Sequence, residues 1–407
     1  MLVLSSRSVK SRWVELEWAS AAYADAERDE LTGTLVPVLR EDCEIPFLLR
    51  RLRHVDARGA DPGDVALSLM SLVSHPREER AAELPKPSSV NLGRPLVFGD
   101  PQYVVRDEDS RVDTALQRGH AVLLFGARRV GKSSMLRQIA SKETLRGRPV
   151  IWLDLQLYGA GSQSPLESVG YIIADALGCT WPSAGPPPAI RIRRLIKDCI
   201  AERQQNPVLL VDEFDLITHQ NYHEFGDWLR SLLSDPATQG VSCVAAGVRP
   251  PWMSVSAPTL LSPWWDIFEP VRLGYFNRDQ VAQFCTWIGE EARQHADTLW
   301  LATGGQPLLV AKAGYMHLIG RPLPDLLANP LDPSGPFAAF VELVASAILP
   351  DDDILRALRD GSSVSKEGRD ALWLAGLVDD PRVNPPIIKG LLFRELILRL
   401  GEGSPGA

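Results

Sequence analysis

Long apolar runs are missing from this 407-residue sequence, and none approaches the roughly 18 residues that a membrane-spanning helix requires. The opening Met1-Leu2-Val3-Leu4 is also too short for the apolar core of a signal peptide. Cysteine is scarce, and the five cysteines lie far apart without a CxxC pair, so neither a disulfide framework nor a zinc knuckle is indicated. We therefore expect a cytoplasmic protein with no membrane partner.

Lysine is rare as well, because only eight of the 43 basic residues are lysines. A motif that demands lysine therefore seldom arises by chance in this chain. The net charge of −8 argues against extensive nucleic-acid binding, so nucleic acid is not an expected partner. The 31 glycines and 32 prolines stay below the share typical of disordered chains, and the length allows about two to four domains.

Strands and helices alternate in the first segment, residues 1–75. Apolar strands are predicted at Leu2–Leu4 and Leu35–Leu39, and helices at Trp13–Ala24, Phe47–Leu52 and Asp64–Val73. Such alternation indicates a parallel sheet. Residues 76–95 are rich in charge and proline, which predicts a semi-rigid linker.

The middle of the chain contains five short apolar stretches separated by helical patterns. They lie at Ala121–Phe125, Val150–Leu155, Val208–Val211, Ser242–Ala246 and Pro270–Leu273. They predict a doubly wound α/β domain over residues 96–276, with a ligand crevice at the carboxyl ends of its parallel strands. Residues 277–320 have a helical pattern. Residues 336–400 combine helices with a hairpin whose return strand is expected near Pro386–Ile388, an order that predicts a winged helix.

The stretch Ala121–Phe125 leads directly into a GxxxxGK[ST] motif, which is followed by a helical pattern. Its residues are all candidates for nucleotide contacts: Gly126, Ala127, Arg128, Arg129, Val130, Gly131, Lys132, Ser133 and Ser134. Glycines let the loop turn its amides toward phosphate oxygens, and the helix dipole adds positive potential. We expect Lys132 to neutralise the β- and γ-phosphates and Ser133 to ligate Mg²⁺. The flanking strand and helix disfavour the alternative, a glycine-rich turn without a ligand.

A second motif, Asp212-Glu213-Phe214-Asp215, follows the stretch Val208–Val211. In P-loop enzymes a carboxylate at such a strand end holds the magnesium shell, and an adjacent glutamate can activate the attacking water. We therefore assign Asp212 to the metal and Glu213 to catalysis. Taken alone, the motif would indicate a solvated acidic loop. Arg249, beyond the stretch Ser242–Ala246, either senses the γ-phosphate or is an ordinary surface arginine, and the pattern leaves both open.

Three further segments complete a resemblance that spans about residues 96–400. Tyr103-Val104-Val105-Arg106 with Asp109, then Leu261–Phe268 with Val271–Leu273, and Thr303–Leu309 occur in the order found in STAND-class AAA-like ATPases, the signal-transduction ATPases with numerous domains. The resemblance implies ATP and Mg²⁺ as ligands and a lid in which Pro307 contacts the adenine or ribose. It also implies a winged helix that holds the inactive state, and a homo-oligomer on activation by an unknown trigger. If the family resemblance is set aside, the sequence Gly305-Gln306-Pro307 indicates only the start of a helix with proline in its first turn.

The first segment resembles the later half of a TIR domain, which has a flavodoxin-like fold. The resemblance rests on the pattern from Ser11 through Trp13 to Glu17 and on the strand Leu35–Leu39 with the following Ile45-Pro46. In TIR enzymes that cleave NAD⁺ the glutamate four residues after the tryptophan is catalytic, which implies this role for Glu17 and NAD⁺ as a substrate. A carboxylate suits the reaction because it stabilises the ribosyl cation that remains when nicotinamide leaves. The family's first strand and helix and the loop after its second strand are absent, so we expect a chain truncated at a mis-assigned start codon, or a relic domain.

The leading hypothesis is a slow P-loop ATPase that acts as a TIR-coupled bacterial immune or stress switch. One alternative is a DNA-associated ATPase that reads DNA through the winged helix. Ten acidic residues against eight basic ones between Pro336 and Leu400 disfavour it. Another is NAD⁺ nucleosidase activity in an intact, longer form. The sequence leaves open the activating signal, the oligomer number and the choice between ATP and GTP.

Overall fold

The computed structural model describes residues 2–5, 37–43, 55–60, 65, 90–92, 94–155, 165–182, 184–216, 219–254, 264–328, 335, 337 and 352–402. The chain divides into two compact units, Met1–Pro85 and Lys86–Ala407, and each is described by itself. The division falls within the segment that the sequence predicts as a linker. The helices expected in the first segment lie outside the described residues, apart from Val65.

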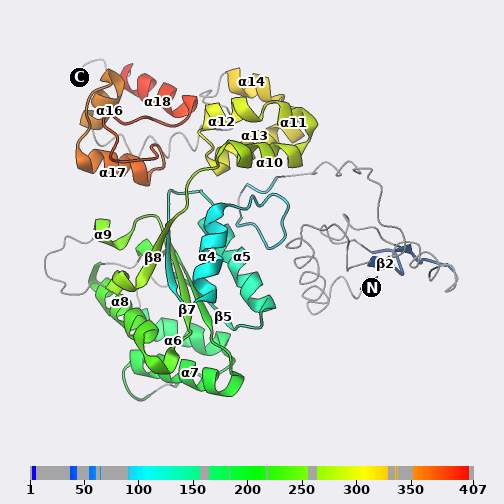
Figure 1. Cartoon of the computed structure of the whole chain (residues 1–407), viewed down its shortest axis with the longest axis vertical. Coiled ribbons are helices and arrows are strands. Elements are labelled where there is room, and N and C mark those ends of the chain that lie inside the picture. Colours follow the sequence, from blue (N-terminus) through cyan, green and yellow to red (C-terminus); the bar gives the residue numbers. More distant parts are fainter. Residues whose placement is uncertain are drawn as a thin grey trace. The chain divides into compact units, whose positions relative to one another are not determined.

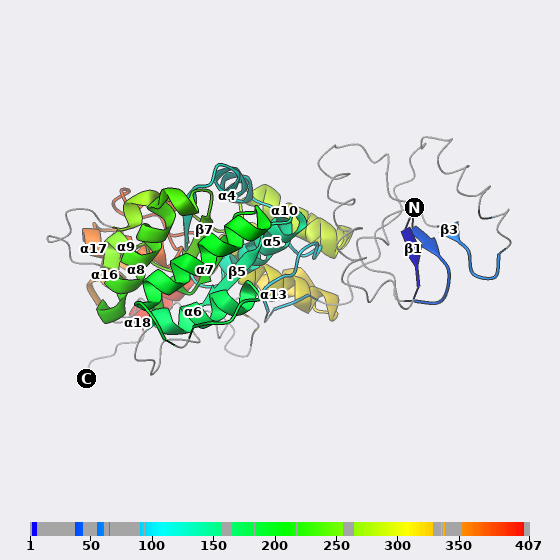
Figure 2. The same ribbon diagram turned by 90° about the horizontal axis from the view of Figure 1, so that it is seen from below.

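The first unit contains a sheet of three parallel strands, β1 (Leu2–Leu4), β2 (Pro37–Leu39) and β3 (Val55–Asp56). Leu2 pairs with Pro37, and Val38 pairs with Val55. Figure 2 shows β1 and β3 in this unit. The predicted parallel sheet is therefore confirmed for the described residues, and β3 is a strand that the sequence patterns did not predict.

The second unit is built around a parallel sheet of five strands in the order β5-β6-β7-β4-β8. Figure 1 labels β5, β7 and β8 of this sheet. Their bounds are Ala121–Phe125 for β4, Val150–Asp154 for β5, Val208–Asp212 for β6, Ser242–Gly247 for β7 and Phe268–Arg272 for β8. Each overlaps a predicted stretch, which confirms the doubly wound α/β fold. Because β7 lies between β4 and β6, the loop after β7 lies between the lysine loop and the acidic motif.

Helices cover both faces of this sheet, and Figure 2 shows α6, α7 and α8 running beside one another. The flanking helices are α4 (Asp107–Gln117), α5 (Lys132–Leu145), α6 (Pro165–Ala176), α7 (Pro188–Arg203) and α8 (His219–Ser234), and the shorter ones are η3 (Phe214–Leu216), η4 (Pro236–Thr238), α9 (Pro251–Ser254) and η5 (Trp264–Ile267). Val122 and Leu124 of β4 face a core with α4 and α5, whereas Leu123 faces a second core with α6, α7 and α8. The strands are apolar at successive positions because both faces are buried. Among the described residues, no helix is long and apolar enough to span a membrane.

A group of helices follows β8, in the region that the sequence predicts as a lid, and is called the lid below. Its helices are α10 (Arg278–Ile288), α11 (Glu290–Gln294), α12 (Ala296–Thr303), α13 (Pro307–Leu318) and α14 (Leu323–Ala328). Asn277 caps α10 by accepting the amide of Gln280, whose side chain accepts the Asn277 amide in return. Pro307 is the first residue of α13, a position where its missing amide costs nothing.

The described carboxyl-terminal helices are α16 (Asp352–Asp360), α17 (Lys366–Leu374) and α18 (Leu391–Glu402). The return strand expected near Pro386–Ile388 is wrong, because the described residues between α17 and α18 form turns and irregular chain. Pro385 and Pro386 lack the amides that a paired strand needs. The loop is closed instead by the Lys389 amide, which donates to the Leu377 carbonyl at 2.8 Å. The winged helix remains a prediction.

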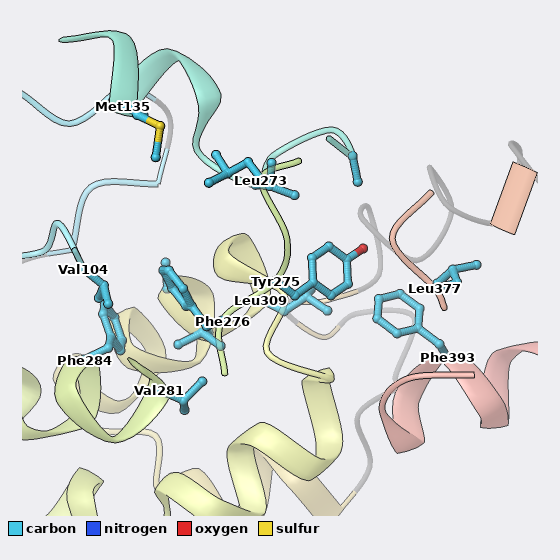
Figure 3. Packing of buried hydrophobic residues seen from close by; sticks show 14 of the residues in the cluster. Val104, Met135, Leu273, Tyr275, Phe276, Val281, Phe284, Leu309, Leu377 and Phe393 are labelled. Carbon is cyan, nitrogen blue, oxygen red and sulfur yellow. The ribbon is translucent and has the colours of Figure 1, made fainter. Parts of the chain in front are cut away.

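One cluster of buried apolar residues connects the core, the lid and the carboxyl-terminal helices (Figure 3). In the segment after β8, Phe276 lies toward Val104 and Phe284, whereas Tyr275 lies toward Phe393 of α18. The lid and the carboxyl-terminal helices therefore share a continuous core with the sheet.

Candidate functional site

The lysine loop joins β4 to α5 in a tight curve. The Lys132 ammonium donates to the carbonyls of Gly126 at 2.9 Å and Ala127 at 3.1 Å. Gly131 has a φ of 102°, in the region that favours glycine, and a Cβ on Gly126 would lie 2.4 Å from the Leu273 carbonyl oxygen. Both glycines of the motif are therefore required by backbone geometry. Burial lowers the pKa of Lys132, and the nearby carboxylates of the acidic motif act in the opposite direction.

The acidic motif lies at the carboxyl end of β6. Asp212 is buried, and its carboxylate makes hydrogen bonds with the Ser133 hydroxyl and with the Glu213 amide, the latter at 3.0 Å. Burial raises the pKa values of Asp212 and Glu213, and their like charges raise that of Glu213 further. Glu213 also has a φ of 53°, which a non-glycine residue adopts only at an energetic cost. The strained residue is thus the one that the sequence assigns to catalysis.

The Ser133 and Asp212 pair has the chemistry of a magnesium site. A hydroxyl and a carboxylate supply hard oxygen ligands. No group of three or more His, Cys, Asp or Glu residues in the described part of the chain could hold a metal by itself. Mg²⁺ is usually held by one or two protein oxygens together with phosphates and waters, so this sparse pair fits a magnesium ion that arrives with a nucleotide.

A cavity of about 370 Å³ lies above the loop. Residues of the motif line it, together with Glu213 and with Pro307 of the lid; the motif residues are Arg128, Arg129, Gly131, Lys132, Ser133 and Ser134. Val248 from the loop after β7 also lines the cavity. Arg249 is exposed and does not belong to the lining, so the structure does not bring it to the cavity. The Ser134 hydroxyl accepts the amide of Leu96 at 3.0 Å and thereby holds the segment before α4 against α5.

Arg106 is a lining residue to which the sequence patterns gave no role. It is buried, and its guanidinium donates to the carbonyls of Val130 at 2.6 Å and Gly274 at 3.0 Å. The guanidinium carbon lies 4.5 Å from the centre of the Phe276 ring. Burial lowers the pKa of Arg106. This side chain links the phosphate loop to the segment that leads into the lid.

Gln306, which precedes Pro307, is a second residue without a predicted role. It is fully buried, its side-chain oxygen accepts the Leu309 amide at 2.8 Å, and its side-chain nitrogen donates to the Arg129 carbonyl at 3.4 Å. Arg129 has a φ of 63°. The first turn of α13 therefore contacts the phosphate loop through Gln306, in addition to the cavity wall that Pro307 supplies.

The carboxyl-terminal helices dock beside the same loop. Arg272, at the end of β8, donates to the carbonyls of Trp373 at 3.0 Å, Asp379 at 3.2 Å and Val378 at 3.3 Å. Its guanidinium lies 4.4 Å from the Trp373 ring, which in turn lies 5.7 Å from the ring of Phe125. Phe125 immediately precedes Gly126. Trp373 of α17 therefore packs against Phe125, the residue that directly precedes the phosphate loop in the sequence.

Comparison with known proteins assigns the first segment and shows similar folds for the rest. Residues 1–69 match the family model described as the TIR domain, which confirms the TIR resemblance. Glu17 lies outside the described residues, so its surroundings are not described. Among curated proteins, none matches the chain.

Several solved structures are similar to part of this chain. The Walker-type ATPase PABY2304 of Pyrococcus abyssi has 16% identity, and the match covers 75% of this chain and 98% of that one with a TM-score of 0.49. A STAND protein with a tetratricopeptide-repeat sensor from Pyrococcus horikoshii has 13% identity, coverage of 78% and 44%, and a TM-score of 0.35. AMPPCP-bound DnaA from Aquifex aeolicus has 15% identity, coverage of 69% and 81%, and a TM-score of 0.40.

Proposed function

We propose that this chain is a nucleotide-dependent signalling switch whose second unit binds ATP with Mg²⁺ and hydrolyses it slowly. The observation that carries the proposal is the convergence of Lys132 and Glu213 on one cavity that Pro307 of the lid helps to enclose. Ser133 and Asp212, the two expected magnesium ligands, lie close enough together to interact, which also supports the proposal. Calorimetric titration of the purified chain with ATP, ADP and GTP in the presence of Mg²⁺ tests this. Binding of no nucleotide at millimolar concentration would refute it.

Each residue has a distinct part in the proposed reaction. Lys132 binds the β- and γ-phosphates, and the loop amides with the α5 dipole bind the remaining negative charge. Ser133 and Asp212 would hold Mg²⁺, and a bound Mg²⁺ would supply positive charge near the phosphates. Glu213 orients the attacking water and accepts its proton. A carboxylate whose pKa is raised toward neutrality is a better base for this step than an ordinary one.

The carboxyl-terminal helices supply the second element of the switch. They dock beside Phe125 through Arg272 and Trp373, so a change in the phosphate loop and a change in their docking are coupled through adjacent residues. The TIR match at residues 1–69 adds a signalling domain. These features support a TIR-coupled immune or stress sensor that assembles into a homo-oligomer when its trigger releases the docked state.

Replacing Arg272 with alanine is expected to loosen this docking. The change removes three hydrogen bonds from a charged donor and one cation–π contact, which together contribute about 2–4 kcal/mol. Amide hydrogen exchange should become faster in α17 and in the loop before α18, and ADP should dissociate faster. Arg382→Ala is the matched control, because the Arg382 side chain is 89% exposed. Equal exchange rates in the wild type and Arg272→Ala would contradict the docking role.

DNA reading through the carboxyl-terminal helices is the less supported alternative. The four cations that could form a DNA-binding face are Arg356, Arg359, Arg369 and Lys389. Arg356, Arg359 and Lys389 form ion pairs with Asp353, Asp360 and Asp379, and Arg369 donates to backbone carbonyls. Salt-dependent binding of duplex DNA would favour this alternative.

NAD⁺ cleavage by the first unit is a second candidate function, favoured by the TIR match. Nicotinamide release from NAD⁺ is the measurement, with the wild type and Glu17→Ala compared. Release that is lost in Glu17→Ala would support the activity. Absence of release from the wild-type chain would refute it for this chain.

A further inference from the structure

The loop after β7, which begins with Val248-Arg249, occupies a central place in the site. Because β7 lies between β4 and β6, this loop lies between the lysine loop and the acidic motif. Val248 lines the cavity, whereas Arg249 does not. Whatever fixes this loop therefore also fixes part of the cavity wall.

Asp215, the last residue of the acidic motif, holds this loop. Its carboxylate accepts a hydrogen bond from the Val248 amide at 2.6 Å, and the next amide along the chain, that of Arg249, also favours the ionised form of Asp215. Hydrogen bonds to an ionised acceptor are about twice as strong as neutral ones. The contact crosses from η3 after β6 to the loop after β7, over 33 residues of sequence.

Gly247 provides a second, independent observation. A Cβ at this position would lie 1.9 Å from the Asp215 Oδ1 atom and 3.1 Å from its Cγ atom. The approach of this carboxylate therefore requires glycine at the end of β7. Asp215 does not belong to the cavity lining, and its described hydrogen bond is to the loop after β7.

We infer that Asp215 is a positioning residue for ATP hydrolysis, which fixes the loop after β7 relative to Glu213. This inference rests on the proposed ATPase function. Asp215 follows Glu213 by two residues in a short turn, and Glu213 already has a strained backbone. The Asp215 contact therefore joins the base and the cavity wall into one rigid unit, and its loss lowers kcat more than it changes nucleotide affinity.

The test compares Asp215→Ala, Asp215→Asn and Gly247→Ala in the full chain. Asparagine keeps a side-chain oxygen that can accept the two amides, whereas alanine does not. We expect Asp215→Ala to lower kcat by about ten- to a hundredfold with KM changed less than about threefold. Asp215→Asn should retain at least about a third of the wild-type kcat. Gly247→Ala should act like Asp215→Ala, and in the Asp215→Ala background it should have less than about a twofold further effect.

Three results would overturn the inference. They are a kcat for Asp215→Ala within threefold of the wild type, equal losses in Asp215→Ala and Asp215→Asn, and fully additive effects of Asp215→Ala and Gly247→Ala. Amide hydrogen exchange of residues 242–251 measures the contact without turnover. Faster exchange is expected in Asp215→Ala and Gly247→Ala but not in Asp215→Asn. A wild-type chain that binds no nucleotide would refute the proposed function, while the exchange data would still show whether Asp215 holds the loop.

Discussion

Replacement of Lys132 by alanine should abolish measurable ATP binding, with affinity lowered by about a hundredfold or more. The ammonium is half-buried and donates to two carbonyls of the loop, so the structure has already removed much of its water. Part of the energetic cost of that dehydration is offset when phosphates bind, because the charge then gains anionic oxygens at short range. Calorimetric titration with ATP at a fixed Mg²⁺ concentration measures the change.

Lys366→Ala is the matched control for this prediction. Lys366 is the first residue of α17 and is exposed, so its removal changes the net charge equally without touching the cavity. Circular dichroism of both variants shows whether the fold is kept. An unchanged ATP affinity in Lys132→Ala would contradict the assignment of the phosphate site and with it the proposed function.

The sheet and its phosphate loop could be predicted because their signals are local. The three central strands of the second unit, β4, β6 and β7, are short and fully buried stretches, as expected when both faces of a parallel sheet are covered. The lysine motif occupies eight consecutive residues, and its glycines are required by positive φ or by the close approach of a carbonyl. The strands and the phosphate loop can therefore both be predicted without knowing which distant residues contact each other.

The residues that the sequence patterns missed act through distant contacts. Arg106 meets Gly274 over 168 residues, Gln306 meets Arg129 over 177 and Arg272 meets Asp379 over 107. No local spacing distinguishes these side chains from surface residues. Asp215 differs, because it stands in a motif that was recognised and its role could have been suspected from that position alone.

The strand predicted near Pro386–Ile388 is wrong for a local reason, not because distant contacts were missed. A short apolar pair after a turn satisfied the strand pattern, although two prolines removed the amides that pairing needs. Ile387 is 67% exposed whereas Ile388 is buried, an alternation that by itself is compatible with a strand. The two prolines without backbone amides therefore indicated the structure of this segment better than its hydrophobicity did.

Replacement of Glu213 by glutamine is expected to separate nucleotide binding from hydrolysis. Glutamine keeps the size of the side chain but cannot accept the proton of the attacking water, so kcat should fall by about a hundred- to ten-thousandfold. ATP affinity should stay within about threefold of the wild type, because Lys132 and the loop amides make the phosphate contacts. Phosphate release and calorimetric titration measure the two quantities in the same preparation.

The same variant should be more stable than the wild type at neutral pH. Burial and the nearby Asp212 raise the pKa of Glu213 above 4.5, so the folded chain binds this proton more tightly than the unfolded chain does. Ionised Glu213 therefore destabilises the fold above its folded-state pKa, and the cost disappears as the pH falls through that value toward 4.5. The Tm of Glu213→Gln should exceed that of the wild type at pH 7.5, and the two Tm values should converge in acid.

Glu224→Gln, at an exposed site on α8, is the matched control and should change neither Tm nor kcat. A Glu213→Gln variant that hydrolyses ATP at the wild-type rate would instead show that another group activates the water.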